Sequence, residues 1–288
     1  MKLLSFQHQG VASWGAVIGD RVADLGRAHP QYPTLQSYLS AGRLPQLAQD
    51  SAWVKADIAL GDITYLPVIT QPEKIICAIR NYHDHHKEVV AAGLDRELSN
   101  HPPIFLRTWR SQAAHGQAIL RPHCSNSLDW EGELAVVIGR SGRNIPEAQA
   151  HEYVAGYSIY NDASIREWQF HAKAIAAGKN FESTGAFGPW MITADEIDPA
   201  RPLELSTRLN GERMQHTNTG NMIFSVAQQI AYASTIFTLV PGDVIVTGTP
   251  GGVGWSSKPP RFMVPGDVVE VEIEGIGVLR NPVAQAAQ

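Results

Sequence analysis

Cysteine is nearly absent from this sequence, and long apolar runs are missing altogether. Cys77 and Cys124 are the only cysteines among 288 residues, which is too few for a disulfide framework and favours a reducing compartment. No stretch approaches the roughly 20 apolar residues that a membrane-spanning helix needs, and polar residues interrupt the first residues before a signal-peptide core can form. The sequence therefore predicts a soluble cytoplasmic protein with no membrane partner.

An excess of positive charge is also lacking. The 23 Lys and Arg are outnumbered by 28 Asp and Glu, which gives a net charge of -5. Nucleic-acid-binding proteins normally carry a basic patch or stripe, so nucleic acid is not expected as a partner. An anionic small molecule would have to be bound by a local group of cations.

Several catalytic motifs are absent as well. The chain has no Gly-x-Ser-x-Gly elbow, no Gly-Lys-Ser/Thr phosphate loop and no His-Glu-x-x-His zinc motif. The glycine-rich segment Gly248 to Gly254 remains, and it allows two interpretations. It is either a tight connection after a strand or a turn that presents Thr249 and backbone amides to a ligand.

The order of patterns along the chain indicates a small N-terminal unit and a larger β-rich unit. Glycines punctuate short apolar runs over residues 2–25, which predicts small antiparallel strands, and helical spacing follows Thr34. We place the boundary near residue 70, with a small α+β domain over residues 1–70 and the main domain over residues 71–288.

Beyond residue 70, segments rich in Val, Ile and aromatic residues predict strands. These segments are residues 74–79, 104–106, 134–138, 153–160, 190–193, 203–209, 244–247 and 268–273, with helices expected over 83–92 and 225–234. Because strands and helices do not alternate regularly, a Rossmann sheet and a TIM barrel are disfavoured. The predicted fold class is α+β with a large share of strand.

Acidic residues at alternate positions run into one predicted strand. Alternation would put Asp129, Glu131 and Glu133 on one face. Buried carboxylates repel one another, so a divalent cation between them is one interpretation, and Asp162 at the end of the next strand is a further oxygen ligand. All-oxygen ligation suits Mg²⁺, Mn²⁺ or Ca²⁺. The other interpretation is an exposed edge strand with solvated acids.

A histidine-rich segment follows the first strand of the main unit. If residues 83–92 are helical, His85 and Glu88 are three positions apart and can meet, so the carboxylate would orient the imidazole as a general base. A polar helix face with solvated histidines is the alternative. A zinc site from His83, His85 and His86 is disfavoured, because histidines so close in sequence rarely converge on one tetrahedral ion.

Taken together, the motifs resemble the fumarylacetoacetate hydrolase family over residues 72–283. The matching pieces are Lys74-Ile75-Ile76-Cys77, Asn81-Tyr82 with His85, Asp129-Trp130-Glu131-Gly132-Glu133-Leu134, Gly156-Tyr157 to Asn161-Asp162, Arg166 with Gln169, Lys179-Asn180-Phe181, Gly188-Pro189-Trp190, Asn210-Gly211-Glu212, and Pro241-Gly242-Asp243 through Gly248-Thr249-Pro250. The resemblance implies a mixed β-roll or β-sandwich catalytic domain, a small N-terminal domain and a homodimer.

The resemblance also implies roles for individual residues. Glu131, Glu133 and Asp162 match the positions that hold Mg²⁺ or Mn²⁺, and His85 with Glu88 match the water-activating pair on a lid. Lys179, expected to be catalytic, matches a position that stabilises an oxyanion, and Gln169 and Thr249 are expected to bind substrate. Arg107 is a departure, because many members have Lys there; it too is expected to contact substrate, through a planar guanidinium.

The resemblance predicts a metal-dependent hydrolase that cleaves a carbon–carbon bond in an acylpyruvate or a related 1,3-diketone or 2-oxo acid, as in aromatic compound catabolism. A decarboxylase of the oxaloacetate type, or an isomerase or hydratase of an oxo acid, could use the same metal site. A non-catalytic ligand-binding homologue is the remaining alternative.

Overall fold

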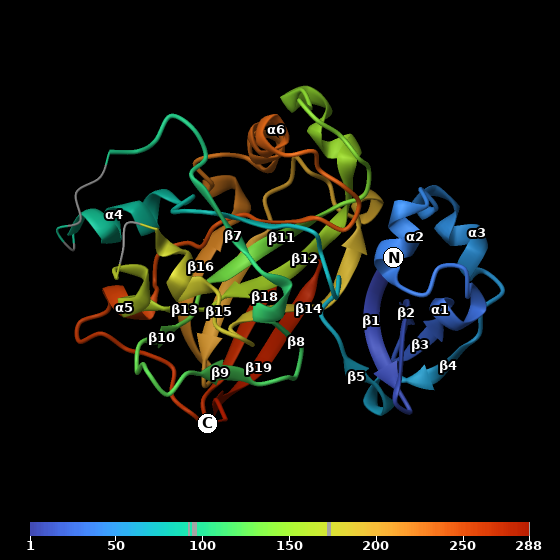
Figure 1. The fold of residues 1–288 in the computed structure, drawn as a ribbon, viewed down its shortest axis with the longest axis horizontal. Helices are drawn as coiled ribbons and strands as arrows, with labels where there is room; N and C mark the ends of the chain where they lie inside the picture. Colours follow the sequence, from blue (N-terminus) through green and yellow to red (C-terminus); the bar gives the residue numbers. More distant parts are fainter. Residues whose placement is uncertain (92, 94–96, 172–173, 288) are drawn as a thin grey trace.

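The computed structural model describes residues 1–91, 93, 97–171 and 174–287. Within these residues, twelve strands form one mainly antiparallel sheet, five strands form a second sheet, and two short strands pair separately. The second sheet lies against the large one, and short helices and loops cover the outside (Figure 1). This is the strand-rich α+β architecture expected from the sequence.

The large sheet runs across the whole molecule. Its main path is β4 (Ala56–Ala59), β3 (Arg21–Asp24), β2 (Val11–Ile18), β1 (Lys2–His8), β14 (Gly185–Thr193), β12 (Val154–Asp162), β11 (Gly132–Ile138), β17 (Val244–Val246), β6 (Ile75–Ala78) and β7 (Ile104–Arg107). Two further strands are attached to it, β5 (Thr64–Tyr65) beside β1 and β8 (Gln112–Ala114) beside β14.

The remaining strands build the second sheet and one short pair. The second sheet has the order β16 (Glu212–Asn218), β15 (Glu204–Leu209), β18 (Val268–Ile273), β19 (Gly277–Gln285) and β9 (Ile119–Arg121). The short pair consists of β10 (Leu128–Asp129) and β13 (Ser164–Ile165).

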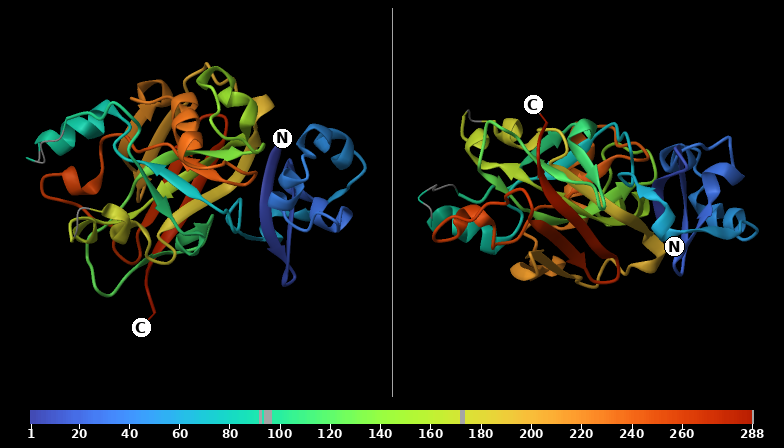
Figure 2. Two further views of the ribbon diagram at one scale, coloured as in Figure 1. Left: turned by 45° about the horizontal axis from the view of Figure 1, so that its top comes forward. Right: turned by 90° about the horizontal axis from the view of Figure 1, so that it is seen from below.

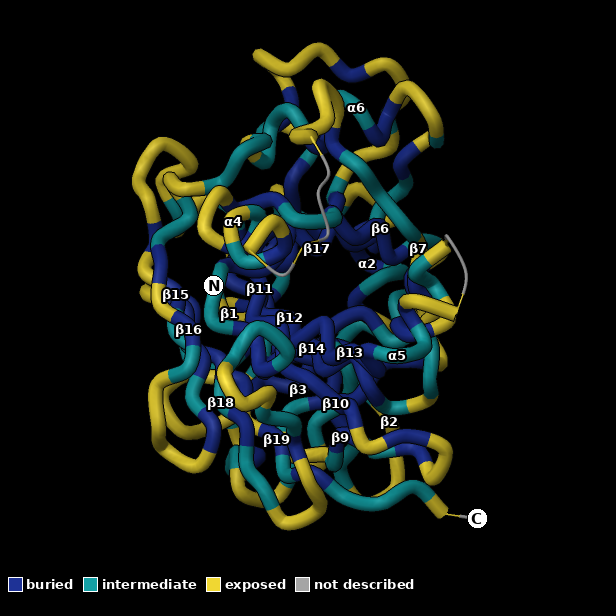
Figure 3. The backbone as a smooth tube through the Cα atoms, turned by 90° about the vertical axis from the view of Figure 1, so that its left-hand side faces the viewer, coloured by how far each residue is buried: buried dark blue, intermediate teal, exposed yellow. Residues whose placement is uncertain are grey.

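Strand β11 lies at the centre of the core and is buried on both faces. Val136 belongs to a buried cluster with Leu205 of the second sheet. Its neighbour Val137 points the other way and belongs to a cluster with Tyr38 and Phe187. Figure 3 shows β11, β12 and β14 as buried strands with exposed loops around them. The residues of β11 are therefore fixed in position by packing from both sides.

The N-terminal residues extend the large sheet at one edge, as the two views in Figure 2 show. Strand β1 pairs with β14, with Lys2 opposite Ile192. Three short helices, α1 (Leu25–Ala28), α2 (Leu35–Ser40) and α3 (Leu47–Ser51), accompany these strands. The hydroxyl of Thr34 caps α2, as its position before the helical spacing predicts. Because the sheet continues across residue 70, the proposed division into two domains stays a prediction.

Three more α-helices lie in the main unit. They are α4 (His83–Ala91), α5 (Arg166–Gln169) and α6 (Val226–Ile236). The short 3-10 helices are Leu44–Gln46, Leu60–Asp62, Trp109–Ser111, Glu147–Tyr153, Ile175–Lys179, Ala194–Glu196, Thr219–Asn221 and Gly254–Ser256. The expected helix over 83–92 is confirmed up to Ala91, and residue 92 lies outside the described residues. None of the described helices is long and apolar enough to cross a membrane.

Two expected strands differ from the structure. Strand β14 begins at Gly185 rather than near Trp190, because the glycines and proline at its start carry no strand pattern. Residues 61–71, whose pattern predicts a strand followed by a linker, contain only the two-residue strand Thr64–Tyr65. Neither difference changes the arrangement of the strands that carry the acidic residues.

Candidate active site

Three carboxylates meet where β11 and β12 run side by side. Antiparallel pairing puts Gly132 opposite Asn161, and the amide of Asp162 donates to the carbonyl of Glu131 at 2.8 Å. The side chains of Glu131, Glu133 and Asp162 each offer an oxygen, and these oxygens all lie within 4.8 Å of one another. All three residues are buried. The pairing of two neighbouring strands thus creates an acidic cluster inside the protein.

Asp129 does not join this cluster, so one expectation from the alternation is wrong. The strand is interrupted between β10, which ends at Asp129, and β11, which begins at Gly132. The Asp129 carboxylate instead accepts from the amides of Gly254 at 2.7 Å and Trp255 at 2.9 Å. Because these acids are buried, the alternative of an exposed strand with solvated acids is excluded.

Three buried cations surround the acids. Lys179 Nζ lies 2.6 Å from Glu131 Oε2 and 2.6 Å from Asp162 Oδ2. Arg166 bridges Asp129 and Glu131 at 2.7 and 2.6 Å, and Arg107 pairs with Asp162. Glu133 has no ion pair with a Lys or Arg of the described residues. Four buried carboxylates therefore face three buried cations, and Glu133 is the acid without a counter-charge.

The surroundings shift the pKa values of Glu131 and Glu133 in opposite directions. Burial alone would raise the pKa of Glu131, but the charges of Lys179 and Arg166 outweigh it and lower the pKa to about 2. Burial raises the pKa of Glu133 well above its usual range, and the negative charges of Asp162 and Glu131 raise it further. Ionised Glu133 is thus the group that gains most from an added positive charge.

A histidine–carboxylate pair on α4 faces the same region. His85 Nδ1 lies 3.2 Å from Glu88 Oε2, as their spacing on a helix predicts. The other oxygen of Glu88 accepts from the amide of Gly252 at 2.7 Å. The carboxylate is held from its second side, so it can orient the imidazole of His85.

The glycine-rich turn over residues 248–254 binds the carboxylates with its backbone amides. Gly248 donates to Glu133 and Gly252 donates to Glu88. Gly252 has φ +95°, and a Cβ there would lie 2.1 Å from the carbonyl oxygen of Met214, so only glycine fits. The amides of this turn bind carboxylates of the protein itself, and the presentation of Thr249 and backbone amides to a ligand stays a prediction.

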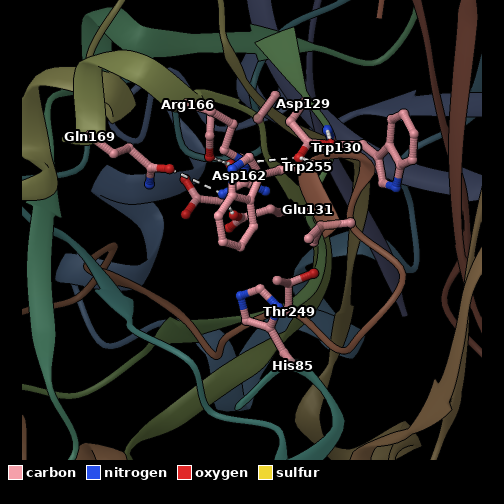
Figure 4. A network of polar contacts seen from close by, with 12 residues as sticks. His85, Asp129, Trp130, Glu131, Asp162, Arg166, Gln169, Thr249 and Trp255 are labelled. Atoms are coloured by element: carbon pink, nitrogen blue, oxygen red, sulfur yellow. Dashed lines mark hydrogen bonds and ion pairs between the residues drawn. The ribbon is translucent and has the colours of Figure 1, made fainter. Parts of the chain in front are cut away.

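A cavity of about 760 Å³ opens over the cluster and the histidine. Six of the expected site residues line it: His85, Glu131, Glu133, Gln169, Lys179 and Thr249. Figure 4 shows His85 and Thr249 on one side, Arg166 and Gln169 on the other, and Glu131 between them. Glu88, Asp162 and Arg107 support this wall from behind.

Two of the expected substrate-binding side chains also hold the site together. Thr249 Oγ1 donates to the carbonyl of Gly132 at 3.1 Å and accepts from Gln215 at 2.9 Å. Gln169 Oε1 accepts from Arg166 at 3.1 Å. The amide nitrogen of Gln169 therefore stays available to a ligand in the cavity.

Comparison with known proteins agrees with this geometry. The family model "Fumarylacetoacetate (FAA) hydrolase C-terminal" matches residues 74–284. The chain belongs to the fumarylacetoacetate hydrolase family. The oxaloacetate tautomerase Fahd2a, mitochondrial, of Rattus norvegicus is 37% identical over 98% of this chain and 91% of its own.

Solved structures of fumarylacetoacetate hydrolase family proteins share the fold. A putative HpcE protein from Mycobacterium smegmatis has a TM-score of 0.89 and 35% identity, with both chains fully covered. The maleylpyruvate hydrolase from Sphingobium sp. SYK-6, in complex with manganese (II) ion and pyruvate, has a TM-score of 0.82 and 26% identity, again with both chains fully covered.

The residues present fit the divalent metal of this family. The cluster offers carboxylate oxygens and no sulfur or imidazole ligand, which suits a hard cation. Glu133 lacks a counter-charge among the described residues, and its burial beside two other acids disfavours ionisation. A divalent cation would supply the missing charge, with Glu131, Glu133 and Asp162 as its protein ligands.

Some members of the site were not found from the sequence. Trp255 and Phe170 line the cavity, and Arg166 is a buried clamp between two acids rather than a free cation for a ligand. A single Trp or Phe in a loop carries no spacing signal, so only the folded chain shows where it lies. Arg166 belongs to the motifs that carry the family resemblance, but its two acidic partners lie 35 and 37 positions away in the sequence, so spacing does not show the pairing.

The substrate-binding role expected for Arg107 is wrong. Arg107 is buried and does not line the cavity. Its guanidinium donates to Asp162, to Ser111 Oγ at 3.1 Å and to Thr184 Oγ1 at 2.7 Å. Arg107 therefore positions the Asp162 carboxylate from behind. With a further bond to the carbonyl of Ala163 at 3.2 Å, its planar fork makes four directed contacts, more than a lysine ammonium can reproduce.

We expect Arg107→Lys to weaken Mn²⁺ binding about tenfold, since loss of a residue that orients a metal ligand costs about 10–100-fold in affinity. Titration calorimetry with Mn²⁺ measures this directly. Arg280→Lys is the matched control, because Arg280 pairs with Glu270 on an exposed part of the second sheet. Equal Mn²⁺ affinity in Arg107→Lys and wild type would show that Asp162 needs no such support.

Proposed function

We propose that this protein is a metal-dependent hydrolase that cleaves the carbon–carbon bond between the acyl carbonyl and the methylene carbon of an acylpyruvate. One observation carries the proposal. His85, which Glu88 orients, lines the same cavity as Glu131 and Glu133 of the three-carboxylate cluster. A general base beside a site for a divalent cation is the combination that hydrolysis of a 1,3-diketone requires.

The reaction follows from what each side chain can do. His85 takes a proton from water, and the water oxygen bonds to the acyl carbonyl carbon. The carbon–carbon bond then breaks, its electron pair stays with the pyruvate fragment, and a proton returns to that carbon. The products are pyruvate and a carboxylic acid. A bound divalent cation supplies positive charge for the oxygens of the 2-oxo acid.

Gln169 can donate a hydrogen bond to the oxygen that gains negative charge, and Lys179, whose three N–H groups are bound to Glu131 and Asp162, adds a positive charge beside it. Both line the cavity beside Glu131, and Lys179 is held as an ammonium. Burial lowers its pKa, but the negative charges of Asp162 and Glu131 outweigh this and raise it. A fixed cation and an amide donor stabilise a developing oxyanion without reorganising during the reaction.

Keto–enol tautomerisation of oxaloacetate is the second candidate. It is favoured by the similarity of nearly the whole chain to proteins with that name from Rattus norvegicus and Xenopus laevis. The same site suits it, since His85 could move a proton at the carbon next to the carbonyl. The cavity of about 760 Å³ also has room for oxo acids larger than oxaloacetate.

The metal we propose is Mg²⁺ or Mn²⁺, and Ca²⁺ is compatible with the same oxygen ligands. Manganese is supported by its presence in the related maleylpyruvate hydrolase structure. We also propose a homodimer that acts on a small molecule and binds neither nucleic acid nor membrane. The cytoplasm stays our prediction for its location, although several relatives are named mitochondrial.

A substrate panel with and without metal tests the proposal. Acetylpyruvate, fumarylpyruvate and oxaloacetate would each be incubated with purified protein plus Mn²⁺ or Mg²⁺, and again with EDTA. We expect pyruvate release from an acylpyruvate, lost by at least a hundredfold in EDTA and restored by added metal. If oxaloacetate were the only substrate and its enol absorbance decayed in a metal-dependent way, the activity would be tautomerisation rather than hydrolysis. If carbon dioxide release were the only reaction observed, the activity would be decarboxylation.

A further inference from the structure

The cavity has a polar floor and apolar walls. Glu131, Gln169 and Lys179 gather on the floor with Arg166, held to one another by the bonds described above. Most of the wall comes from apolar side chains at residues 78–79, 103–105, 170, 174–176 and 255. Arg80, His85, Glu133 and Thr249 also line the cavity, so apolar side chains form one part of its wall and polar side chains the rest.

The apolar wall begins directly beside the floor. The Lys179 ammonium lies 5.4 Å from the centre of the Phe105 ring. Phe170 follows Gln169 at the end of α5, and Ile175 begins the short helix that ends at Lys179. Gln169 and Lys179 are therefore each linked, along the chain or by direct contact, to apolar residues of the wall. The floor and the wall have a fixed geometry relative to each other.

Two aromatic rings stand at the outer end of the wall. Phe170 and Trp255 have ring centres 6.1 Å apart and tilted by 38°. Phe170 is 55% exposed, so the pair lies where the cavity meets solvent. The backbone amide of Trp255 donates to Asp129, which pairs with Arg166 of the floor, so the backbone of Trp255 is held close to the floor.

We propose that the substrate of this site carries an apolar acyl arm, which lies along Phe105 and under the Phe170–Trp255 pair while its 2-oxo acid head occupies the floor. The 2-oxo acid head group rests on the proposed function. The apolar arm is inferred from the residues that form the wall of the cavity. Cavities of about 300–1,000 Å³ hold drug-sized ligands, so a four-carbon dicarboxylate would leave the apolar walls uncovered. Aromatic or medium-length aliphatic acylpyruvates fit both parts.

Binding of simple 2-oxo acids tests the arm without requiring turnover. In Mn²⁺, phenylpyruvate should bind about 10–100-fold tighter than pyruvate by calorimetry, the gain expected for burying one aromatic ring. In Phe170→Ala/Trp255→Ala that gain should fall to a few-fold, with pyruvate affinity unchanged. Trp53→Ala, which removes a 66% exposed Trp of the N-terminal unit, should retain the full gain.

Turnover separates failure of this inference from failure of the proposed function. Tight phenylpyruvate binding without cleavage of acetylpyruvate or benzoylpyruvate would support the apolar arm of the substrate and contradict the proposed hydrolase activity. Cleavage of acetylpyruvate together with equal affinities for pyruvate and phenylpyruvate would reject the arm and keep the hydrolase. Arg80 also lines the cavity, so a preference for fumarylpyruvate over benzoylpyruvate, through the carboxylate at the end of its arm, would equally overturn the proposal.

Discussion

Glu133→Gln should lower metal-dependent turnover by about a thousandfold or more and leave the protein folded. The substitution keeps the shape of the side chain, and the amide of Gly248 can still donate to its oxygen. It removes the carboxylate that has no counter-charge among the described residues, and with it one of the three proposed metal ligands. A thousandfold loss corresponds to about 4 kcal/mol in the barrier.

The same variant should be more stable than wild type in EDTA at neutral pH. Folding raises the pKa of Glu133, so its ionised form lowers the free energy of unfolding above the ordinary carboxyl range of about 4.3. Removing that charge should raise Tm by about 2–4 °C for each kcal/mol gained. The difference in stability between Glu133→Gln and wild type should shrink as the pH falls toward about 4.3, because Glu133 of the wild type is then protonated and uncharged.

Thermal unfolding with and without Mn²⁺ checks both parts. Wild type should gain several degrees on addition of Mn²⁺, because a ligand that binds only the folded state stabilises it, whereas Glu133→Gln should gain almost none. Glu274→Gln is the control, since it removes an exposed partner of Arg201 that contributes little to stability. Turnover within tenfold of wild type in Glu133→Gln would rule out Glu133 as a metal ligand.

The strands of the core were predictable because they are buried on both faces. A run such as Leu134–Ile138 is apolar throughout, and the structure encloses it between two clusters. The pairing of β11 with β12 was not predicted from the sequence. That pairing brings Glu131 next to Asp162, thirty-one positions later in the chain. From the residues alone the metal site was an open alternative, and the family resemblance selected the three ligands.

The contacts that support the site could not be predicted from the sequence, for a physical reason. Periodicity reports which face of an element is buried, but it does not report which loop returns to that face. Glu88 and Glu133 accept amides from one turn more than a hundred positions away. Arg107 shows the same limit, since its residue type indicated a cation near substrate while its burial places it behind Asp162.

His85→Gln should lower kcat by about 10²–10⁴-fold, the range that a positioned general base contributes. His85 is not one of the clustered carboxylates, so Mn²⁺ affinity should stay within a few-fold of wild type. Glu133→Gln should lose metal binding and turnover together, whereas His85→Gln should lose turnover alone. Measuring metal affinity and turnover in both variants therefore distinguishes a metal ligand from a general base.

Two further variants show whether His85 acts through its oriented imidazole. Glu88→Gln should lower kcat by about tenfold with KM nearly unchanged, because the carboxylate touches His85 and Gly252 rather than the cavity. His83→Gln is the matched control, since His83 is an exposed residue of the same helix and should leave kcat unchanged. If His85→Gln and His83→Gln had the same kcat, α4 would serve only as cover for the cavity, and the proton would have to move through another side chain of its wall.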